Sequence, residues 1–337
     1  MKKTVHFFLT LIIILAALLP ISAKEALFEG DYYNIKINYE DKSKPGDAVF
    51  VRMIVSQTDL QSKKNKINLS ETKSQLELYL NEKRLDKTNF YELTEKRTAK
   101  KSNSVNSVTL LAGIPLSSWW SSKDSYSLKI VYTLSDKSKY DLSLPFVLEH
   151  KDFISETIQL DAKNTGIKTD TSTKRMEQIN KLNAILGTVN SEHVYQTSPY
   201  IPPTKATRRT SYFADRRVYA YSDGKSSTSL HYGTDYGIPT GSKVTACAAG
   251  RVVMAEDRIS TGWSVVIEHL PGLYSLYYHM SELKVHEGDI IESGTLIGLS
   301  GATGLATGPH LHWEMRLNMA AVNPDYFTTD FTCSSSK

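Results

Sequence analysis

The histidines near the C-terminus and an upstream His–Asp pair are the residues of this chain best suited to chemistry. His310 and His312 stand one residue apart in GATGLATGPHLHWEM, so a strand there would present both imidazoles on one face. In HYGTD, His231 and Asp235 stand four residues apart, which again places both on one face of a strand or of a helix. The nearby glycines favour an extended or looped backbone over a helix. The sequence therefore offers four groups that one site could use.

Two of these histidines and the aspartate form a suitable donor set for zinc. Imidazole nitrogen and carboxylate oxygen are both good Zn²⁺ ligands, and His312 would complete a set with His231 and Asp235. Three protein ligands leave a fourth position for water, as in catalytic rather than structural zinc sites. Zinc lowers the pKa of such a water to about 7. The sequence thus predicts one Zn²⁺ per chain.

A hydrolytic zinc site also needs groups that handle protons and stabilise an oxyanion. His310 is a candidate for one task and His279, in YSLYYHM, for the other, because histidine titrates in the useful range. Which residue performs which task stays open. Taken alone, an HxH pair or a single strand histidine is a weak signal. The prediction therefore depends on all the candidate residues meeting in the fold.

The segment that carries these residues predicts a glycine-rich antiparallel β domain over residues 208–330. Short apolar runs separated by glycine-containing turns indicate strands rather than helices. The runs are KVTACAAGRVVMA, SVVIEHL, YSLYYHM, DIIESGTLIGLSG and HLHWEMRL.

The upstream part of the chain, residues 24–160, predicts an immunoglobulin-like β-sandwich. Apolar and polar residues alternate in several short segments with polar stretches between them, as in antiparallel sandwiches. These segments are 33–39, 48–55, 75–80, 107–114, 126–134 and 140–148. They contain no constellation of catalytic residue types. The fold class predicted for the whole chain is therefore all-β.

Residues 161–207 predict a helical linker followed by an irregular lead-in. Apolar residues recur at helical spacing, with Asp170 or Ser172 as a possible N-cap and Gly187 at the end. The apolar positions are Met176, Ile179, Leu182, Ile185 and Leu186. The prolines that follow oppose regular structure. One amphipathic helix between two β domains is the expectation.

The first 23 residues resemble a cleaved secretory signal. Lys2 and Lys3 precede an apolar run, Phe7 to Leu19, and the segment ends at Ala23, a small residue suited to cleavage. That run is short for a membrane span. The sequence predicts an exported chain, in the periplasm, the cell envelope or the extracellular space, without a stable transmembrane span after cleavage.

The amino-acid composition excludes some other classes of protein. Hydrophobic residues make up 40% and charged residues 23%, as in ordinary globular proteins. A formal net charge of +4 is too small to indicate a nucleic-acid partner. Two cysteines, Cys247 and Cys333, are too few for a zinc–thiolate site, and whether they pair cannot be read from the sequence.

The motifs together resemble one known family. HYGTDYGIPTGSKVTACAAGRVV, LYYHMS, VHEGDIIESGTLIGLSGATG and TGPHLHWEMR occur in the order found in the lysostaphin-type (LytM-like) zinc endopeptidases, which cut peptidoglycan cross-bridges. The resemblance covers roughly residues 208 to 327. It implies that His231, Asp235 and His312 hold zinc and that His279 and His310 are catalytic. It also implies that the substrate is the peptide part of bacterial cell-wall peptidoglycan.

Two short stretches depart from the family pattern. FADRR has Ala214 where the family usually has glycine, and residues 318–320, Asn-Met-Ala, replace a glycine turn after the last strand. Neither contains a predicted zinc ligand. Both departures therefore concern the shape of the expected substrate groove rather than the expected zinc chemistry.

Other interpretations stay open beside the endopeptidase. A catalytically inert relative would bind the cell wall or regulate other wall hydrolases, although such proteins typically lose ligands. A cupin also uses HxH, but no histidine follows His312 to complete its ligand set. A lipoyl-like hairpin would need a lysine that VHEGDIIESGTLIG lacks.

The sequence also leaves several properties of the proposed enzyme undecided. These are the bond cut (D-Ala to a diamino acid, or a glycine bridge), the oligomeric state, and any envelope protein partners of the N-terminal domain. Shielding of the site by the segment SEHVYQ (191–196) is a further open possibility.

Overall fold

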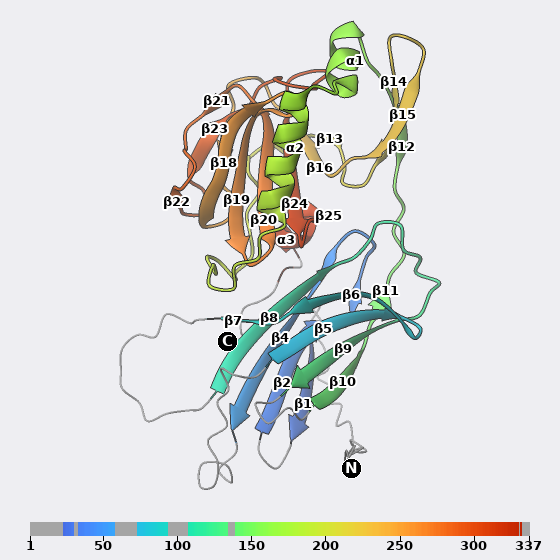
Figure 1. The fold of residues 1–337 in the computed structure, drawn as a ribbon, viewed down its shortest axis with the longest axis vertical. Helices are drawn as coiled ribbons and strands as arrows, with labels where there is room; N and C mark the ends of the chain where they lie inside the picture. Colours follow the sequence, from blue (N-terminus) through green and yellow to red (C-terminus); the bar gives the residue numbers. More distant parts are fainter. Residues whose placement is uncertain are drawn as a thin grey trace.

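The computed structural model describes residues 23–29, 33–57, 73–93, 107–133, 139–329 and 331. Cys333 and all of the predicted signal peptide except its last residue lie outside these ranges. Two β-rich regions follow each other along the chain and are joined by a linker that carries two helices (Figure 1). In the described ranges, no helix is both long and apolar enough to cross a membrane.

The N-terminal region consists mainly of two antiparallel sheets that share one core. Alternation along the strands turns Ile37 of one sheet and Ile130 of the other into the same buried cluster. The first sheet has the order β1 (Ala23–Glu29), β2 (Tyr33–Glu40), β4 (Ala48–Gln57), β8 (Ser107–Pro115) and β7 (Tyr91–Glu92). The second has the order β10 (Lys139–Pro145), β9 (Tyr126–Thr133), β5 (Lys73–Leu80) and β6 (Lys83–Asn89).

The predicted strands are present in this region, with one correction. The strand predicted at 140–148 is divided, because the chain leaves β10 at Pro145 and then forms β11 (Val147–Leu148), which pairs in parallel with β3 (Lys42–Ser43). Proline lacks the N–H that a continuous ladder needs. The architecture is a β-sandwich, and its immunoglobulin-like character stays a prediction.

The linker contains two helices where the sequence predicted one. α1 (Ala162–Thr169) is short and begins at Asp161, whose carboxylate accepts from the N–H of Asn164. α2 (Thr173–Leu186) begins after Ser172, whose hydroxyl accepts from the N–H of Arg175, and ends at Gly187. α1 has almost no apolar periodicity, so hydrophobic spacing could not reveal it.

A large antiparallel sheet forms the centre of the C-terminal region. Its order is β13 (Arg209–Ser211), β16 (Gly233–Tyr236), β24 (Leu311–Leu317), β20 (Leu273–Met280), β19 (Gly262–Leu270), β18 (Gly250–Arg258) and β22 (Ile290–Ile291), with β25 (Ala320–Val322) beside β24. α2 lies across this sheet, and its residue Leu186 packs with Met254, Val266 and Leu276 (Figure 1). The glycine-rich β domain predicted from the sequence is therefore present.

Smaller elements complete the C-terminal region. β17 (Lys243–Thr245), β23 (Leu296–Leu299) and β21 (Glu282–Leu283) form one three-stranded sheet, and α3 (Pro324–Thr329) follows β25. β12 (Ser155–Gln159), β14 (Arg216–Ala220) and β15 (Ser226–Leu230) form another. The sequence placed residues 155–159 in the sandwich, whereas β12 pairs in parallel with β14.

The two regions are in direct contact. Phe50 of β4 packs against Tyr326, Phe327 and Phe331, with ring centroids 5.0 to 6.5 Å apart. Beside this aromatic cluster, the side-chain N–H of Asn318 donates to the carbonyl of Gly113 in β8. Because a sandwich residue is buried in the core of the C-terminal region, the two regions share part of their packing.

The two departures from the family motif keep the backbone of a glycine turn. Ala214 has φ 64°, and Asn318 and Met319 have φ 48° and 71°. These values lie in the left-handed region, which costs an L-residue roughly 1–2 kcal/mol relative to glycine. The turns are therefore held by their surroundings, as Asn318 shows through its contact with β8.

Candidate metal centre and active site

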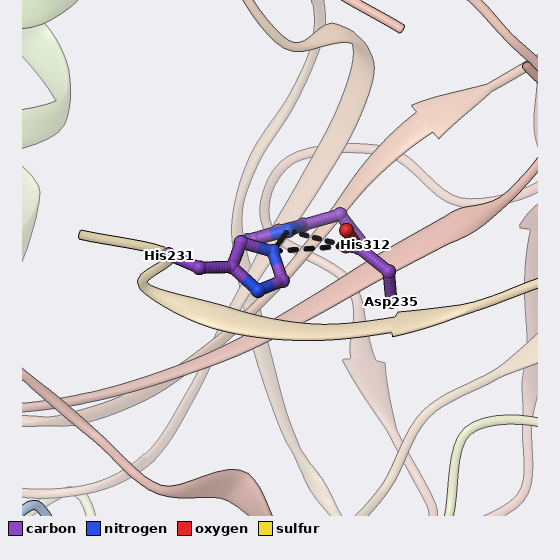
Figure 2. Close-up of side chains that lie close together, drawn as sticks. All are labelled: His231, Asp235 and His312. Carbon is purple, nitrogen blue, oxygen red and sulfur yellow. Dashed lines mark hydrogen bonds and ion pairs between the residues drawn. The ribbon is translucent and has the colours of Figure 1, made fainter. Parts of the chain in front are cut away.

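His231, Asp235 and His312 converge in one buried cluster (Figure 2). Asp235 lies opposite His312 because β16 and β24 pair antiparallel in that register. The Nε2 atom of His231 lies 3.0 Å from Oδ1 of Asp235 and 3.0 Å from Nδ1 of His312. The Nδ1 atom of His312 lies 2.9 Å from the same carboxylate oxygen. Three donor atoms from two separate stretches of chain therefore face one point.

His231 reaches this cluster from the connection before β16, not from a strand face shared with Asp235. β16 begins beside β24 at Gly233, where an added Cβ would lie 2.3 Å from the carbonyl oxygen of Trp313. Only glycine permits this close approach. The glycine of HYGTD thus lets the backbone pass close enough to β24 for both side chains to meet His312.

Hydrogen bonds fix which nitrogen each histidine offers to the cluster. The Nδ1 atom of His231 lies 2.8 Å from the carbonyl oxygen of Tyr212, which can only accept. Nδ1 therefore carries the proton, and Nε2 has a free lone pair. The Nε2 atom of His312 lies 3.3 Å from Oε2 of Glu314, which leaves its Nδ1 for a metal. Partners of this kind orient metal-binding histidines and raise their basicity.

Arg217 fixes the third donor. Its Nη2 donates to Oδ2 of Asp235 at 3.2 Å, so Oδ1 of that carboxylate is turned to the histidines. Its Nε donates to Oε1 of Glu156 at 2.8 Å. Glu156 belongs to β12, so a strand that precedes the linker helices also supports the cluster.

The charges within the cluster balance one another. Burial opposes the charged form of His312, but hydrogen bonds to Asp235 and Glu314 outweigh it and raise the pKa of His312 to about 9. Burial would raise the pKa of Asp235, yet His231 and His312 hold it well below its usual value. Burial lowers the pKa of His231. A pKa above neutral means that the imidazole of metal-free His312 is protonated on both ring nitrogens. A metal ion that binds at Nδ1 would displace the proton on that nitrogen.

The donor set fits zinc. The closest donor atoms lie 2.9 to 3.0 Å apart. One ion that bonds nitrogen and oxygen at about 2.0–2.2 Å can reach all three with little movement. Two imidazoles and one carboxylate are also the kind of ligands that Zn²⁺ prefers.

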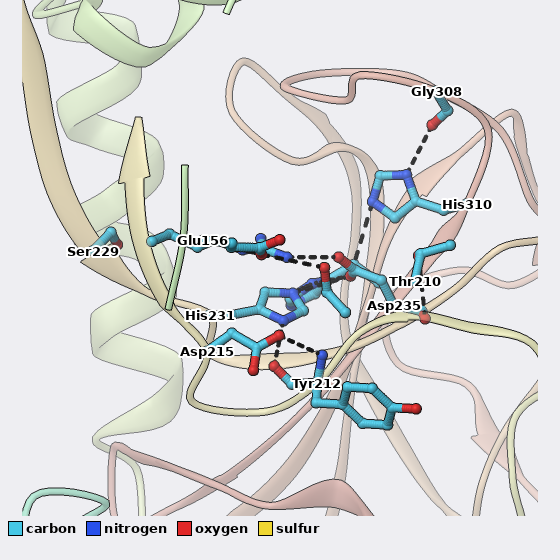
Figure 3. A network of polar contacts seen from close by, with 12 residues as sticks. Glu156, Thr210, Tyr212, Asp215, Ser229, His231, Asp235, Gly308 and His310 are labelled. Atoms are coloured by element: carbon cyan, nitrogen blue, oxygen red, sulfur yellow. Dashed lines mark hydrogen bonds and ion pairs between the residues drawn. The ribbon is translucent and has the colours of Figure 1, made fainter. Parts of the chain in front are cut away.

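His310 and His279 lie beside this cluster. The rings of the two histidines have centroids 4.7 Å apart, and Nε2 of His310 is 3.9 Å from Oδ1 of Asp235. The Nδ1 atom of His310 donates to the carbonyl of Gly308 at 2.8 Å (Figure 3). The Nδ1 atom of His279 donates to the carbonyl of Thr303 at 2.7 Å. The same logic as for His231 leaves Nε2 of both histidines as a proton acceptor.

The backbone of His279 is unusual. Its φ of 61° lies in the left-handed region, and its N–H donates to the carbonyl of Thr261 at 2.8 Å. Burial lowers the pKa of His279 to about 3, with His310 and His312 adding to the effect. Strained residues of this kind are concentrated at functional sites. His279 is therefore neutral and held in a fixed position.

All five predicted site residues line one pocket of about 710 Å³. The sequence reasoning had not assigned a role to Glu314, Arg217 or Tyr278, whose ring stacks on His312 at 5.3 Å with planes 7° apart. Glu314 could have been found, since it lies two residues from His312 and thus on the same strand face. No local pattern marks Arg217 or Tyr278 as partners of the cluster.

Other histidines and the proposed shielding segment lie elsewhere. His193 of the 191–196 segment contacts Glu268 at 2.7 Å, and no residue of that segment lines the pocket. His269 is buried in a network with Ser275, near the buried thiol of Cys247, which has no disulfide partner within the part of the chain that the structure describes. The structure thus gives no support to shielding by this segment.

A conservative change at Glu314 tests its support of His312. Glu314→Gln keeps the shape but removes the negative charge that makes His312 a better ligand. We expect the affinity for zinc to fall about tenfold or more, measured by competition with a chromophoric chelator. Glu268→Gln is the matched control, because Glu268 is also buried and bonded to a histidine, His193, outside the cluster. Equal affinities in the two variants would contradict the role of Glu314.

Comparison with known proteins agrees with the geometry. Residues 229–324 match peptidase family M23, and this range includes every candidate zinc ligand and both adjacent histidines. These residues form an M23 peptidase domain. The resemblance seen in the sequence motifs is confirmed.

Curated relatives match over the M23 domain. The DD-carboxypeptidase/endopeptidase Mpg of Neisseria meningitidis serogroup B is 42% identical over 95 residues, which are 28% of this chain and 22% of that protein. The peptidoglycan DD-endopeptidase ShyA of Vibrio cholerae is 34% identical over 134 residues, which are 40% of this chain and 30% of that protein. The chain thus spans less than a third of the length of either relative.

One solved structure resembles nearly the whole chain. A Pseudomonas aeruginosa protein assigned to peptidase M23 superposes with a TM-score of 0.51 at 19% identity, covering 86% of this chain and 96% of that one. At this identity the likeness concerns the fold alone. It supports the arrangement of a mostly β chain that includes an M23 domain.

Proposed function

We propose that the chain is a zinc metallo-endopeptidase that hydrolyses peptide cross-links of bacterial peptidoglycan. The observation that carries the proposal is the meeting of two histidines and an aspartate that could hold a metal ion with two further histidines in one pocket. One relative of this domain is described as a DD-carboxypeptidase/endopeptidase and another as a peptidoglycan DD-endopeptidase. Inert relatives typically lose ligands, and the predicted set is complete here.

In this proposal His231, Asp235 and His312 hold the metal. Zinc, when bound there, acidifies water and polarises a carbonyl group. Tyr212, Glu314 and the guanidinium of Arg217 keep the three donors turned toward one point. Because these supports are backbone and buried side-chain contacts, the site is preorganised and loses little energy to rearrangement during the reaction.

His310 and His279 handle protons. Each directs its Nδ1–H to a carbonyl oxygen, so each offers an unprotonated Nε2. His310, whose Nε2 is 3.9 Å from Asp235, is placed to accept the proton of the attacking water. An imidazole that has accepted a proton becomes a donor, and it can then protonate the leaving amine or hydrogen-bond to the oxyanion.

The proposed function requires an exported chain. The signal at residues 1–23 would direct the protein to the cell envelope, where peptidoglycan lies. We retain the division into a sandwich domain (24–160), a linker and lead-in (161–207) and a peptidase domain (208–330), except that residues 155–159 are grouped with the peptidase domain because β12 pairs with β14. The sandwich is the candidate region for binding envelope proteins.

Digestion of purified sacculi tests the proposal. The chain without residues 1–23, loaded with zinc, should release peptide fragments whose masses correspond to cleaved cross-links. Thorough chelation should abolish release, and added zinc should restore it, because the ligand set alone cannot acidify water. Release that continues after the zinc content has fallen to zero, or no release by fully loaded protein, would contradict the proposal.

A further inference from the structure

The pocket has one wall made by residues that lie outside the M23 match. β12 and β14 pair in parallel there, with Glu156 beside Arg217 and Ile158 beside Tyr219. All four residues line the pocket. Residues two apart on a strand share a face, so this wall runs from the zinc ligands along β14. Residues before the linker helices therefore contribute, through β12, to the surface that a substrate would touch.

α1 closes the far end of this wall and brings Lys168 into the pocket. The helix is attached to the glycine-rich loop before β24, where the side-chain N–H of Asn164 donates to the carbonyl of Ala306. The Lys168 ammonium lies over the ring of Tyr219, 4.1 Å from its centroid. Tyr219 stands two residues, roughly 7 Å, along β14 from Arg217, which contacts the zinc ligand Asp235. A positive charge thus lies a short distance from the zinc site.

Every carboxylate that lines the pocket is already engaged by a cation of the fold. Glu156 and Asp235 both bind Arg217, at 2.8 and 3.2 Å. Glu314 binds Arg316 as well as its histidine partner. The acidic side chains therefore have their charge compensated within the protein.

Lys168 and Arg208 are the pocket cations that lack such a partner. Among the described residues, no carboxylate lies within ion-pair distance of either side chain, although both line the pocket. Burial, together with the positive charges of Arg175 and Arg217, lowers the pKa of Lys168. A bound anion would offset this cost and form a charge-assisted contact.

We propose that Lys168 binds a free carboxylate of the substrate on a residue next to the bond that is cut. The inference rests on the proposed function and specifies which kind of cross-link the enzyme would cut. Of the two kinds of cross-link left open by the sequence, the link to a diamino acid carries such a carboxylate when that residue is a dicarboxylic acid, whereas a glycine bridge does not. The unpaired Lys168 therefore favours a cross-link to a dicarboxylic diamino acid as the substrate.

Two synthetic cross-linked peptides provide the test. They are identical except that the diamino acid carries either a free carboxylate or a carboxamide. We expect the wild-type protein to prefer the carboxylate in kcat/KM by about tenfold, mainly through KM, since a charge-assisted contact contributes about that much binding. Lys168→Met should abolish the preference, and Lys168→Arg should retain most of it. Lys163→Met, an exposed lysine on the same helix outside the pocket, is the matched control and should keep it.

The outcomes separate this inference from the proposed function. Wild-type protein that cuts both peptides equally, or Lys168→Met protein that keeps the wild-type preference, overturns the inference and leaves the endopeptidase standing. Wild-type protein that cuts neither peptide and no sacculi removes the proposed function and the inference with it. Zinc content and melting temperature of each variant show whether it is folded. If Lys168→Met does not fold, Lys168→Gln replaces it in the same comparison. The preference of the wild-type protein for the carboxylate peptide then tests the inference together with that variant.

Discussion

Replacing His312 with alanine should remove zinc binding and cross-link cleavage together. Nδ1 of His312 is one of three donors within about 3 Å of one another, and two remaining donors cannot hold the ion firmly. Loss of the metal forfeits several kcal/mol of transition-state stabilisation, so we expect cleavage to fall about a thousandfold or more. Zinc content by elemental analysis and fragment release from sacculi measure the two effects.

His286→Ala is the control for this experiment. His286 is exposed and lies outside the pocket, so its removal should change neither zinc content nor cleavage. Circular dichroism would show whether the His312 variant keeps its β structure. A folded His312→Ala protein that binds one zinc and digests sacculi at the wild-type rate would exclude the proposed metal centre.

Replacing His279 should lower the rate of cleavage without removing the bound zinc. Asparagine is the informative replacement, because it tolerates the left-handed backbone that His279 adopts, at φ 61°, but cannot accept a proton near neutral pH. His279→Asn should keep one zinc per chain. We expect kcat to fall by about 10²–10⁴, the usual contribution of one general acid–base group. The same separation is expected for His310→Ala.

Zinc content and kcat must be measured on the same samples of each variant. His312→Ala should lose zinc and activity, whereas His279→Asn should lose activity alone. If the His279 variant loses its zinc, the residue belongs to the metal site instead. If kcat stays at the wild-type value, His279 has no role in proton transfer.

The sequence was sufficient to identify the residues of the candidate site. The spacing within HYGTD and HLH, with the order of the surrounding motifs, selected five residues that the structure places in one pocket. Strand alternation also predicted six segments of the sandwich but not β1 or β6, and apolar runs between glycine-containing turns predicted the central strands of the peptidase domain, such as β18, β19, β20 and β24. These features are local, because side-chain alternation follows directly from strand geometry.

Several properties were decided only by tertiary structure. His231 does not share a strand face with Asp235; it meets the cluster because Gly233 lets the chain pass close to β24. The pairing of β12 with β14 joins residues 61 positions apart, Glu156 and Arg217, and α1 has no periodic pattern to reveal it. The tautomers of the site histidines depend on carbonyls and carboxylates that the fold brings to them.

The difference arises because some interactions join neighbouring residues in the sequence, whereas others join residues that are far apart along the chain. A hydrophobic repeat records which face of an element is buried, so it can be read from neighbouring residues. A hydrogen bond between Arg217 and Asp235, or a lysine of α1 over a tyrosine of β14, depends on how whole elements pack. The sequence by itself determined the candidate zinc chemistry of this protein, and the packing of the linker against the peptidase domain decided the shape and charge of its pocket.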